Sequence, residues 1–142
     1  MEDGKRKVVW HGMFLFLLGL LTGFFELKFK NPRMGLAAHL EGLMNGTFLL
    51  ALGAIWAEVR LSPAWKLAAY CGALYGTYAN WAVTTFAAVF GTVALTPLTG
   101  ASRSAQSWQE GVVMVGFTSV GLVMVATSVL LLAGLRRRAT GG

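Results

Sequence analysis

The chain has 142 residues, which is enough for one domain, spanning residues 1–142. Its residues are 56% hydrophobic and only 13% charged, well below the roughly one quarter that is usual in soluble domains. This composition excludes an ordinary soluble domain and predicts an all-α integral membrane protein. The net charge of +6 comes from residues at the ends of apolar segments, where cations meet lipid head groups. No basic stripe with interleaved aromatic residues occurs, so we expect no nucleic acid as a partner.

The first expected membrane helix covers about residues 8–25. Its centre, Met13–Leu18, is entirely apolar, and Gly19 and Gly23 form a small-x-x-x-small face suited to close packing in lipid. Basic residues precede the helix, as they precede a signal peptide, but no small-residue cleavage site follows it. We therefore expect this helix to stay in the membrane. The polar loop that follows contains Pro32, which prevents the helix from continuing.

The second expected helix, about residues 35–57, carries His39, Glu41 and Asn45. At about 100° per residue, Glu41 and Asn45 share one face, whereas His39 lies about 160° away from Glu41. An ionised side chain deep in a membrane costs roughly 2.5–3.5 kcal/mol, so such residues are candidates for function. The alternative for His39 and Glu41 is a purely structural role, as a buried hydrogen-bonded pair that stabilises the bundle. For His11, near the start of the first helix, the alternative is a solvated histidine at the interface.

The third expected helix, about residues 64–93, lies in a stretch without formal charge between Lys66 and Arg103. Asn80 and Thr84 are four residues apart and share a face. Tyr78 falls near the middle of the span, whereas anchoring aromatic residues sit at the ends of a span. Polar faces on two adjacent helices predict a small polar cavity within the membrane.

The fourth expected helix, about residues 111–135, contains only apolar and small residues with a few hydroxyls, and we interpret it as scaffold. The four segments together predict a four-transmembrane-helix bundle. Basic residues near the two termini and between the second and third helices outnumber those on the other side; these residues are Lys5, Arg6, Lys7, Arg60, Lys66 and Arg136–Arg138 against Lys28, Lys30, Arg33 and Arg103. The positive-inside rule therefore predicts that both termini are cytoplasmic.

Motifs of soluble enzymes are absent from the sequence. It contains no glycine-rich phosphate loop, no G-x-S-x-G elbow, no HExxH and no CxxC. Two histidines and one cysteine do not suffice for the usual four-ligand zinc site. A single histidine does suffice to hold haem, because the porphyrin supplies the other nitrogen ligands.

Three stretches of the chain resemble the hydroxylaminobenzene mutases: Asn31–Gly46, Ala51–Trp56 and Tyr75–Trp81. Those proteins are small bacterial membrane enzymes of nitroarene breakdown, and they convert hydroxylaminobenzene to 2-aminophenol. The resemblance implies an isomerase that transfers a hydroxyl group within one molecule, with a small aromatic hydroxylamine as substrate. It also implies a multi-pass protein of the bacterial cytoplasmic membrane, with the lipid bilayer as its surroundings.

The chain is also distantly similar to styrene oxide isomerase, which binds ferric haem b. The shared pattern is Ala-His, five residues, then Asn-Gly, met here by Ala38–His39 and Asn45–Gly46, with aromatic-Ala-Asn at residues 78–80 and His-Gly at residues 11–12. This similarity implies that His39 ligates the haem iron and that Asn45 contacts substrate. It further implies His11 as a second cofactor-binding residue and a homotrimer with haem near a subunit boundary.

One departure from the isomerase pattern concerns Thr84, which stands where the isomerase has a catalytic tyrosine. A threonine cannot replace a phenol, so that role is lost or has moved to Tyr75 or Tyr78. The resemblance leads to a hypothesis in which ferric haem b acts as a Lewis acid on the substrate oxygen. In this hypothesis Glu41 carries a proton, and the candidate catalytic residues are Asn45, Glu41, Tyr78, Asn80 and Thr84, with Trp81 beside the aryl ring.

Three alternatives follow from the same residues. The first is acid catalysis without a metal, with Glu41 as the proton donor. The second is a small four-helix proton-coupled exporter that uses Glu41, although such exporters carry their glutamate in the first helix. The third is a membrane protein that binds haem or quinone without catalysis.

Overall fold

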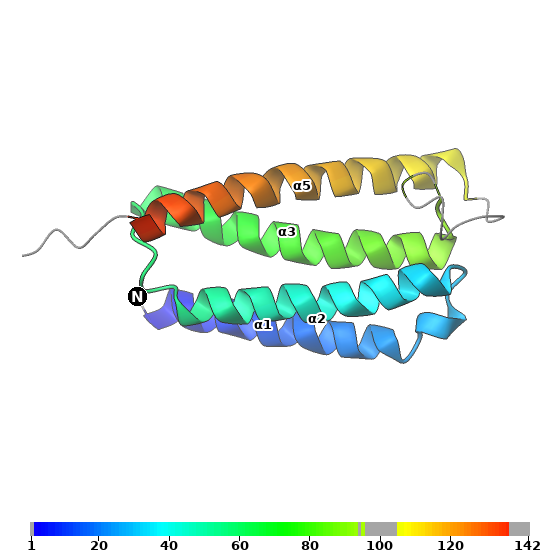
Figure 1. Cartoon of the computed structure of the whole chain (residues 1–142), viewed down its shortest axis with the longest axis horizontal. Helices are drawn as coiled ribbons and strands as arrows, with labels where there is room; N and C mark the ends of the chain where they lie inside the picture. The colour runs from blue at the N-terminus through cyan, green and yellow to red at the C-terminus, as the bar shows by residue number, and fades with distance from the viewer. Residues whose placement is uncertain (1, 94, 96–104, 137–142) are drawn as a thin grey trace, which may run out of the picture.

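The computed structural model describes residues 2–93, 95 and 105–136 of the chain. All regular secondary structure within these residues is helical, which confirms the all-α class. The elements are α1 (Glu2–Gly23), the 3-10 helix η1 (Glu26–Lys28), α2 (Pro32–Ala54), α3 (Pro63–Phe90) and α5 (Ser107–Arg136). The four α-helices lie lengthwise beside one another, and the start of α1 and the end of α5 are at the same end of the molecule (Figure 1).

The helices follow one another across the molecule in chain order. α2 packs against both α1 and α3, and α5 packs mainly against α3. Successive helices run in opposite directions (Figure 1), as short connections between neighbours require. Two clusters of buried side chains form the core, one around Leu15, Leu49 and Trp56, and the other around Met34 and Val113.

Glycines bring the backbones of α1 and α2 close together. A Cβ atom on Gly12 would lie 2.8 Å from the backbone nitrogen of Leu50, and one on Gly19 would lie 2.7 Å from that of Leu43. Contacts this short leave no room for a side chain, so the small-residue face expected on the first helix is confirmed as a packing face. The resulting helix pair holds the candidate site residues of α2 in place.

The helix ends differ from the expected ones by a few residues, each for a local reason. α1 begins at Glu2, because its charged first turns continue the helix beyond the apolar segment. Pro32, expected in the loop, is instead the first residue of α2, where a missing N–H costs nothing and the Asn31 side chain caps the helix. α3 ends at Phe90, because Gly91 adopts a left-handed conformation with φ 70°.

The other helix ends also differ by a few residues from the expected ones. α2 ends at Ala54, three residues before the expected end near residue 57, and α5 begins at Ser107, before the expected start near residue 111. Most of the polar loop expected before α5 lies outside the described residues, as do three of the arginines used to predict orientation: Arg103, Arg137 and Arg138.

Among the described helices, one is both long and apolar enough to cross a membrane. This helix is α5, whose most apolar stretch has a mean hydropathy of 2.2. That α1, α2 and α3 also cross stays a prediction. Many large apolar side chains nevertheless face outward from α1 and α5, including Leu17, Leu20, Leu21, Val115, Leu122 and Val125. Apolar surface of this extent is typical of contact with lipid or with another chain.

Candidate functional site

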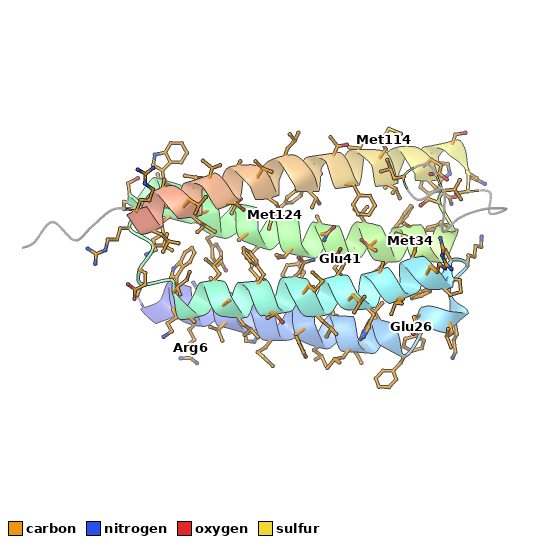
Figure 2. All side chains as sticks on the ribbon, in the orientation of Figure 1. Arg6, Glu26, Met34, Glu41, Met114 and Met124 are labelled. Carbon is orange, nitrogen blue, oxygen red and sulfur yellow. The ribbon has the colours of Figure 1, made fainter. Side chains whose placement is uncertain are left out.

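Glu41 is the centre of a polar cluster between α2 and α3 (Figure 2). Its Oε2 atom accepts a hydrogen bond from the Asn45 side-chain amide at 3.1 Å. The same oxygen accepts a second hydrogen bond from the Asn80 side-chain amide. The expectation that Glu41 and Asn45 share a face of one helix is confirmed, and the structure adds Asn80 from the next helix as a third member.

The two amides act on only one of the two carboxylate oxygens. Oε1 of Glu41 has no hydrogen-bond partner among the described residues. Hydrogen bonds from two different helices fix the orientation of the carboxylate, and Oε1 remains open to a ligand. The arrangement is suited to accept a proton at Oε1 and return it, because both lone-pair directions used on Oε2 are already occupied.

His39 lies on the other side of α2, against α1. Its Nδ1 atom is 2.8 Å from the carbonyl oxygen of Gly19. A carbonyl oxygen only accepts, so Nδ1 carries the proton, and in the neutral ring Nε2 keeps its lone pair. A Cβ atom on Gly23 would lie 2.7 Å from Nδ1, so glycine at this position leaves the space that the ring needs. The predicted separation of His39 from Glu41 around the helix is confirmed by these different neighbours.

The residues present therefore fit a haem ligated by His39. A metal-bound histidine commonly donates its other N–H group to a carbonyl or carboxylate, which fixes the tautomer and the ring orientation. The hydrogen bond from Nδ1 of His39 to Gly19 has this form. It leaves Nε2 as the nitrogen available to iron.

His11 belongs to a different contact, with Tyr78 of α3. Nδ1 of His11 is 3.1 Å from the Tyr78 hydroxyl oxygen, and that hydroxyl donates to the His11 carbonyl oxygen at 3.3 Å. His11 precedes Gly19, the partner of His39, by eight residues, which is about 12 Å along a helix. Within one chain, the His11 ring therefore has different neighbours from the His39 ring, and its role in binding a cofactor stays a prediction.

The other predicted residues of α3 do not join the Glu41 cluster through hydrogen bonds. The Thr84 hydroxyl donates to the backbone carbonyl of Asn80 at 2.8 Å, and the Tyr75 hydroxyl lies 2.7 Å from the Ser119 hydroxyl of α5. Tyr78 and Tyr75 lie about 160° and about 140° around the helix from Asn80. Neither phenol therefore shares the face of α3 that meets Glu41.

Sequence reasoning missed a hydrogen bond between α1 and α3. The indole N–H of Trp81 donates to the Thr22 hydroxyl at 3.1 Å. Both residues line a cavity of about 450 Å³ whose other lining residues are apolar apart from Lys28. The sequence signal for this contact was that Thr22 is the one hydroxyl-bearing residue of α1 and lies in its apolar half.

Comparison with known proteins identifies the class of protein to which the chain belongs. The chain matches the family described as styrene oxide isomerase over residues 4–136, and it belongs to that family. It is 42% identical over 132 residues to hydroxylaminobenzene mutase HabB of Ectopseudomonas oleovorans, covering 92% of this chain and 80% of the relative. It is 41% identical over 127 residues to hydroxylaminobenzene mutase HabA of the same organism, covering 89% and 94%. No solved structure matches the chain.

These matches confirm the resemblance found in the sequence. The chain is an isomerase, as its similarity to two mutases over most of its length shows. This result disfavours the exporter and the non-catalytic carrier among the alternatives.

Proposed function

We propose that this isomerase converts hydroxylaminobenzene to 2-aminophenol by moving the hydroxyl group within the molecule. The names of its two relatives support the substrate. The structural observation that carries the proposal is the Glu41 carboxylate, which two amides hold by one oxygen while the other oxygen stays open. A net isomerisation needs no electron donor and no net water, which suits a small helical chain.

The atom balance defines what the protein must supply. The N–O bond breaks, a C–O bond forms at the ortho carbon, the proton on that carbon leaves, and the nitrogen gains one proton. One group that takes a proton at carbon and returns one at nitrogen satisfies this balance. We assign this role to Oε1 of Glu41, with Asn45 and Asn80 orienting the carboxylate through Oε2.

We propose ferric haem b as the cofactor and Nε2 of His39 as its protein ligand. The hydrogen bond from Nδ1 of His39 to Gly19 supports this assignment, because it leaves Nε2 unprotonated in the neutral ring. When bound, ferric haem supplies a Lewis acid that weakens the N–O bond. Tyr78 and Trp81 face α1, on the same side as His39, and we assign them the contacts to the aryl ring.

The two halves of this site face opposite sides of α2, and this geometry supports assembly as a homotrimer. His39 bonds to α1, whereas Glu41 bonds to α3. Within one chain the two side chains therefore contact different neighbouring helices. In a cyclic trimer, one face of each subunit meets a different face of the next. We infer that His39 of one subunit and Glu41 of its neighbour complete one site.

We propose that all four helices cross the bacterial cytoplasmic membrane with both termini in the cytoplasm. The apolar surface of α1 and α5 and the basic residues at the terminal end of the bundle support this orientation. The surrounding lipid then acts as a reservoir of the apolar substrate and keeps water away from the reacting ring. A periplasmic signal from a reporter fused to the C-terminus would contradict this orientation.

The proposed reaction is tested by running it in water labelled with oxygen-18. Uncatalysed acid rearrangement lets water attack the ring, mainly at the para carbon. Transfer within the enzyme delivers the substrate's own oxygen to the nearest carbon, the ortho one. We expect 2-aminophenol without the label. Heavy oxygen in this product, or mainly the para isomer, would contradict the retained-hydroxyl reaction.

Two variants separate the roles within the site. Glu41→Gln should slow turnover without changing which oxygen enters the product, because it removes the proton carrier and keeps the shape. Asn45→Ala should lower turnover, since one donor to Oε2 is lost, and the haem content should stay unchanged. Positioned proton transfer contributes roughly 10²–10⁴-fold to a rate, and we expect the effect of Glu41→Gln within this range.

A further inference from the structure

A second cavity lies at the end of the bundle that carries the N-terminus, away from Glu41. It has a volume of about 490 Å³ and lies where the start of α1, the α2–α3 connection and the start of α3 meet. Two lysines, a tryptophan and a tyrosine supply its polar lining; these residues are Lys7, Lys66, Trp56 and Tyr70. We call this cavity the terminal groove.

Two hydrogen-bond donors in the terminal groove lack partners. The Trp56 side chain is only 5% exposed, and its indole N–H has no hydrogen-bond partner among the described residues. A Cβ atom on Gly4 would lie 2.8 Å from this nitrogen, so glycine there leaves the donor accessible. The Tyr70 hydroxyl likewise has no hydrogen bond to the described part of the chain. Both donors are therefore available to a ligand that enters the groove.

The charge of the terminal groove is entirely positive. The Lys66 ammonium donates to the carbonyl of Val59 at 2.9 Å and lies 5.3 Å from the centre of the Trp56 ring. An ammonium has three N–H donors, so Lys66 keeps donors for a ligand. Lys7 adds a second cation, and no carboxylate occurs among the residues that line the cavity. Unpaired donors and two cations together favour an anion with several acceptor oxygens.

We propose that the terminal groove binds the phosphate of an anionic phospholipid. The apolar lining residues, Leu61, Pro63 and Leu67, suit the uncharged part of such a molecule. The groove lies at the basic end of the bundle, where Arg6 also projects (Figure 2), and this end faces the anionic leaflet in the proposed orientation. The inference rests on the membrane placement proposed above, but it does not depend on the reaction.

Binding is tested on the purified, delipidated full chain in detergent. Native mass spectrometry measures retention of added dioleoylphosphatidylglycerol, with dioleoylphosphatidylcholine as the zwitterionic comparison. We expect preferential retention of phosphatidylglycerol. Lys66→Gln should weaken this retention by about fivefold, the effect of one cation near a lipid surface. Lys30→Gln, which removes a lysine at the opposite end of the bundle, should leave it unchanged.

A second variant tests whether weaker lipid retention results from misfolding. Trp56→Phe keeps an aromatic ring and removes only the N–H donor, so it should also weaken retention while circular dichroism stays unchanged. Equal retention of the two lipids would overturn the proposal, as would an equal effect of Lys30→Gln and Lys66→Gln. Displacement of phosphatidylglycerol by millimolar inorganic phosphate would show a site for free phosphate and overturn the lipid assignment. Turnover is not measured, so failure here leaves the proposed reaction untouched.

Discussion

At the scale of single residues, hydrogen bonds to backbone and side-chain atoms assign different roles to residues of similar type. His39 donates to a backbone carbonyl and keeps Nε2 free, whereas His11 pairs with the side chain of Tyr78. Asn45 and Asn80 both donate to Glu41. Composition alone does not distinguish the two histidines, whereas the contacts of each imidazole ring do distinguish them.

The first prediction compares the two histidines. His39→Ala should remove the Soret absorbance of the purified protein and abolish turnover. Even outer-shell changes at metal sites cost roughly 10–100-fold in affinity, and loss of the ligand itself should cost more. His11→Ala should keep the Soret band, because His11 lies about two helical turns from Gly19. Full haem and full turnover in His39→Ala would make His39 a structural residue, and equal losses in both variants would mean that we ranked the histidines wrongly.

At the scale of helices, the α1–α2 pair depends on glycine at its contact face. The second prediction is that Gly19→Ala destabilises the protein, because the added methyl meets the backbone of Gly42 and Leu43 within 3 Å. Overpacking of this kind costs typically 1–3 kcal/mol, which exceeds the gain of up to about 1 kcal/mol in helix propensity. Thermal unfolding followed by tryptophan fluorescence measures the change.

Gly121→Ala is the matched control for this prediction. It makes the same substitution inside α5, where a Cβ atom would meet nothing within 4 Å. We expect a neutral or slightly stabilising effect, because only the helix propensity changes. An equal loss of stability in both variants would show that glycine is needed for a reason other than the close approach of α1 and α2.

Helix ends were harder to anticipate than helix positions. Hydropathy marks the apolar part of a helix, but hydrogen bonding continues for as long as backbone conformation and caps allow. The charged first turns of α1 and the proline at the start of α2 belong to their helices for this reason. The connection between α3 and α5 lies largely outside the described residues.

At the scale of the whole molecule, the proposed site is divided between two faces of α2. The third prediction is that two inactive variants complement each other when they are coexpressed. His39→Ala damages one face and Glu41→Ala the other. In randomly mixed cyclic trimers, roughly a quarter of the subunit boundaries combine two intact faces. We expect about that fraction of wild-type turnover from the purified mixture.

In the control mixture, each of the two variants has its substitution in the Glu41 cluster, and His39 is intact in both. Glu41→Ala mixed with Asn80→Ala leaves no boundary with an intact Glu41 cluster, so this mixture should show no more turnover than the average of its two variants measured separately. Complementation in the first mixture and not in the second supports a site shared between subunits. If neither mixture regains activity while wild-type and variant subunits are shown to assemble together, the site lies within one chain.

The sequence alone determined the helical class, the approximate place of each helix and the family, because apolar segments and short motifs are local features of the chain. It also predicted that Glu41 and Asn45 share a face, since the geometry of one helix fixes that relation. Only the tertiary structure decided which side chains from different helices meet. Asn80 reaches Glu41, Tyr78 reaches His11, and the Gly19 carbonyl accepts from His39. These pairs depend on how each helix is rotated about its axis, and the glycine contacts between helices set that rotation through steric packing.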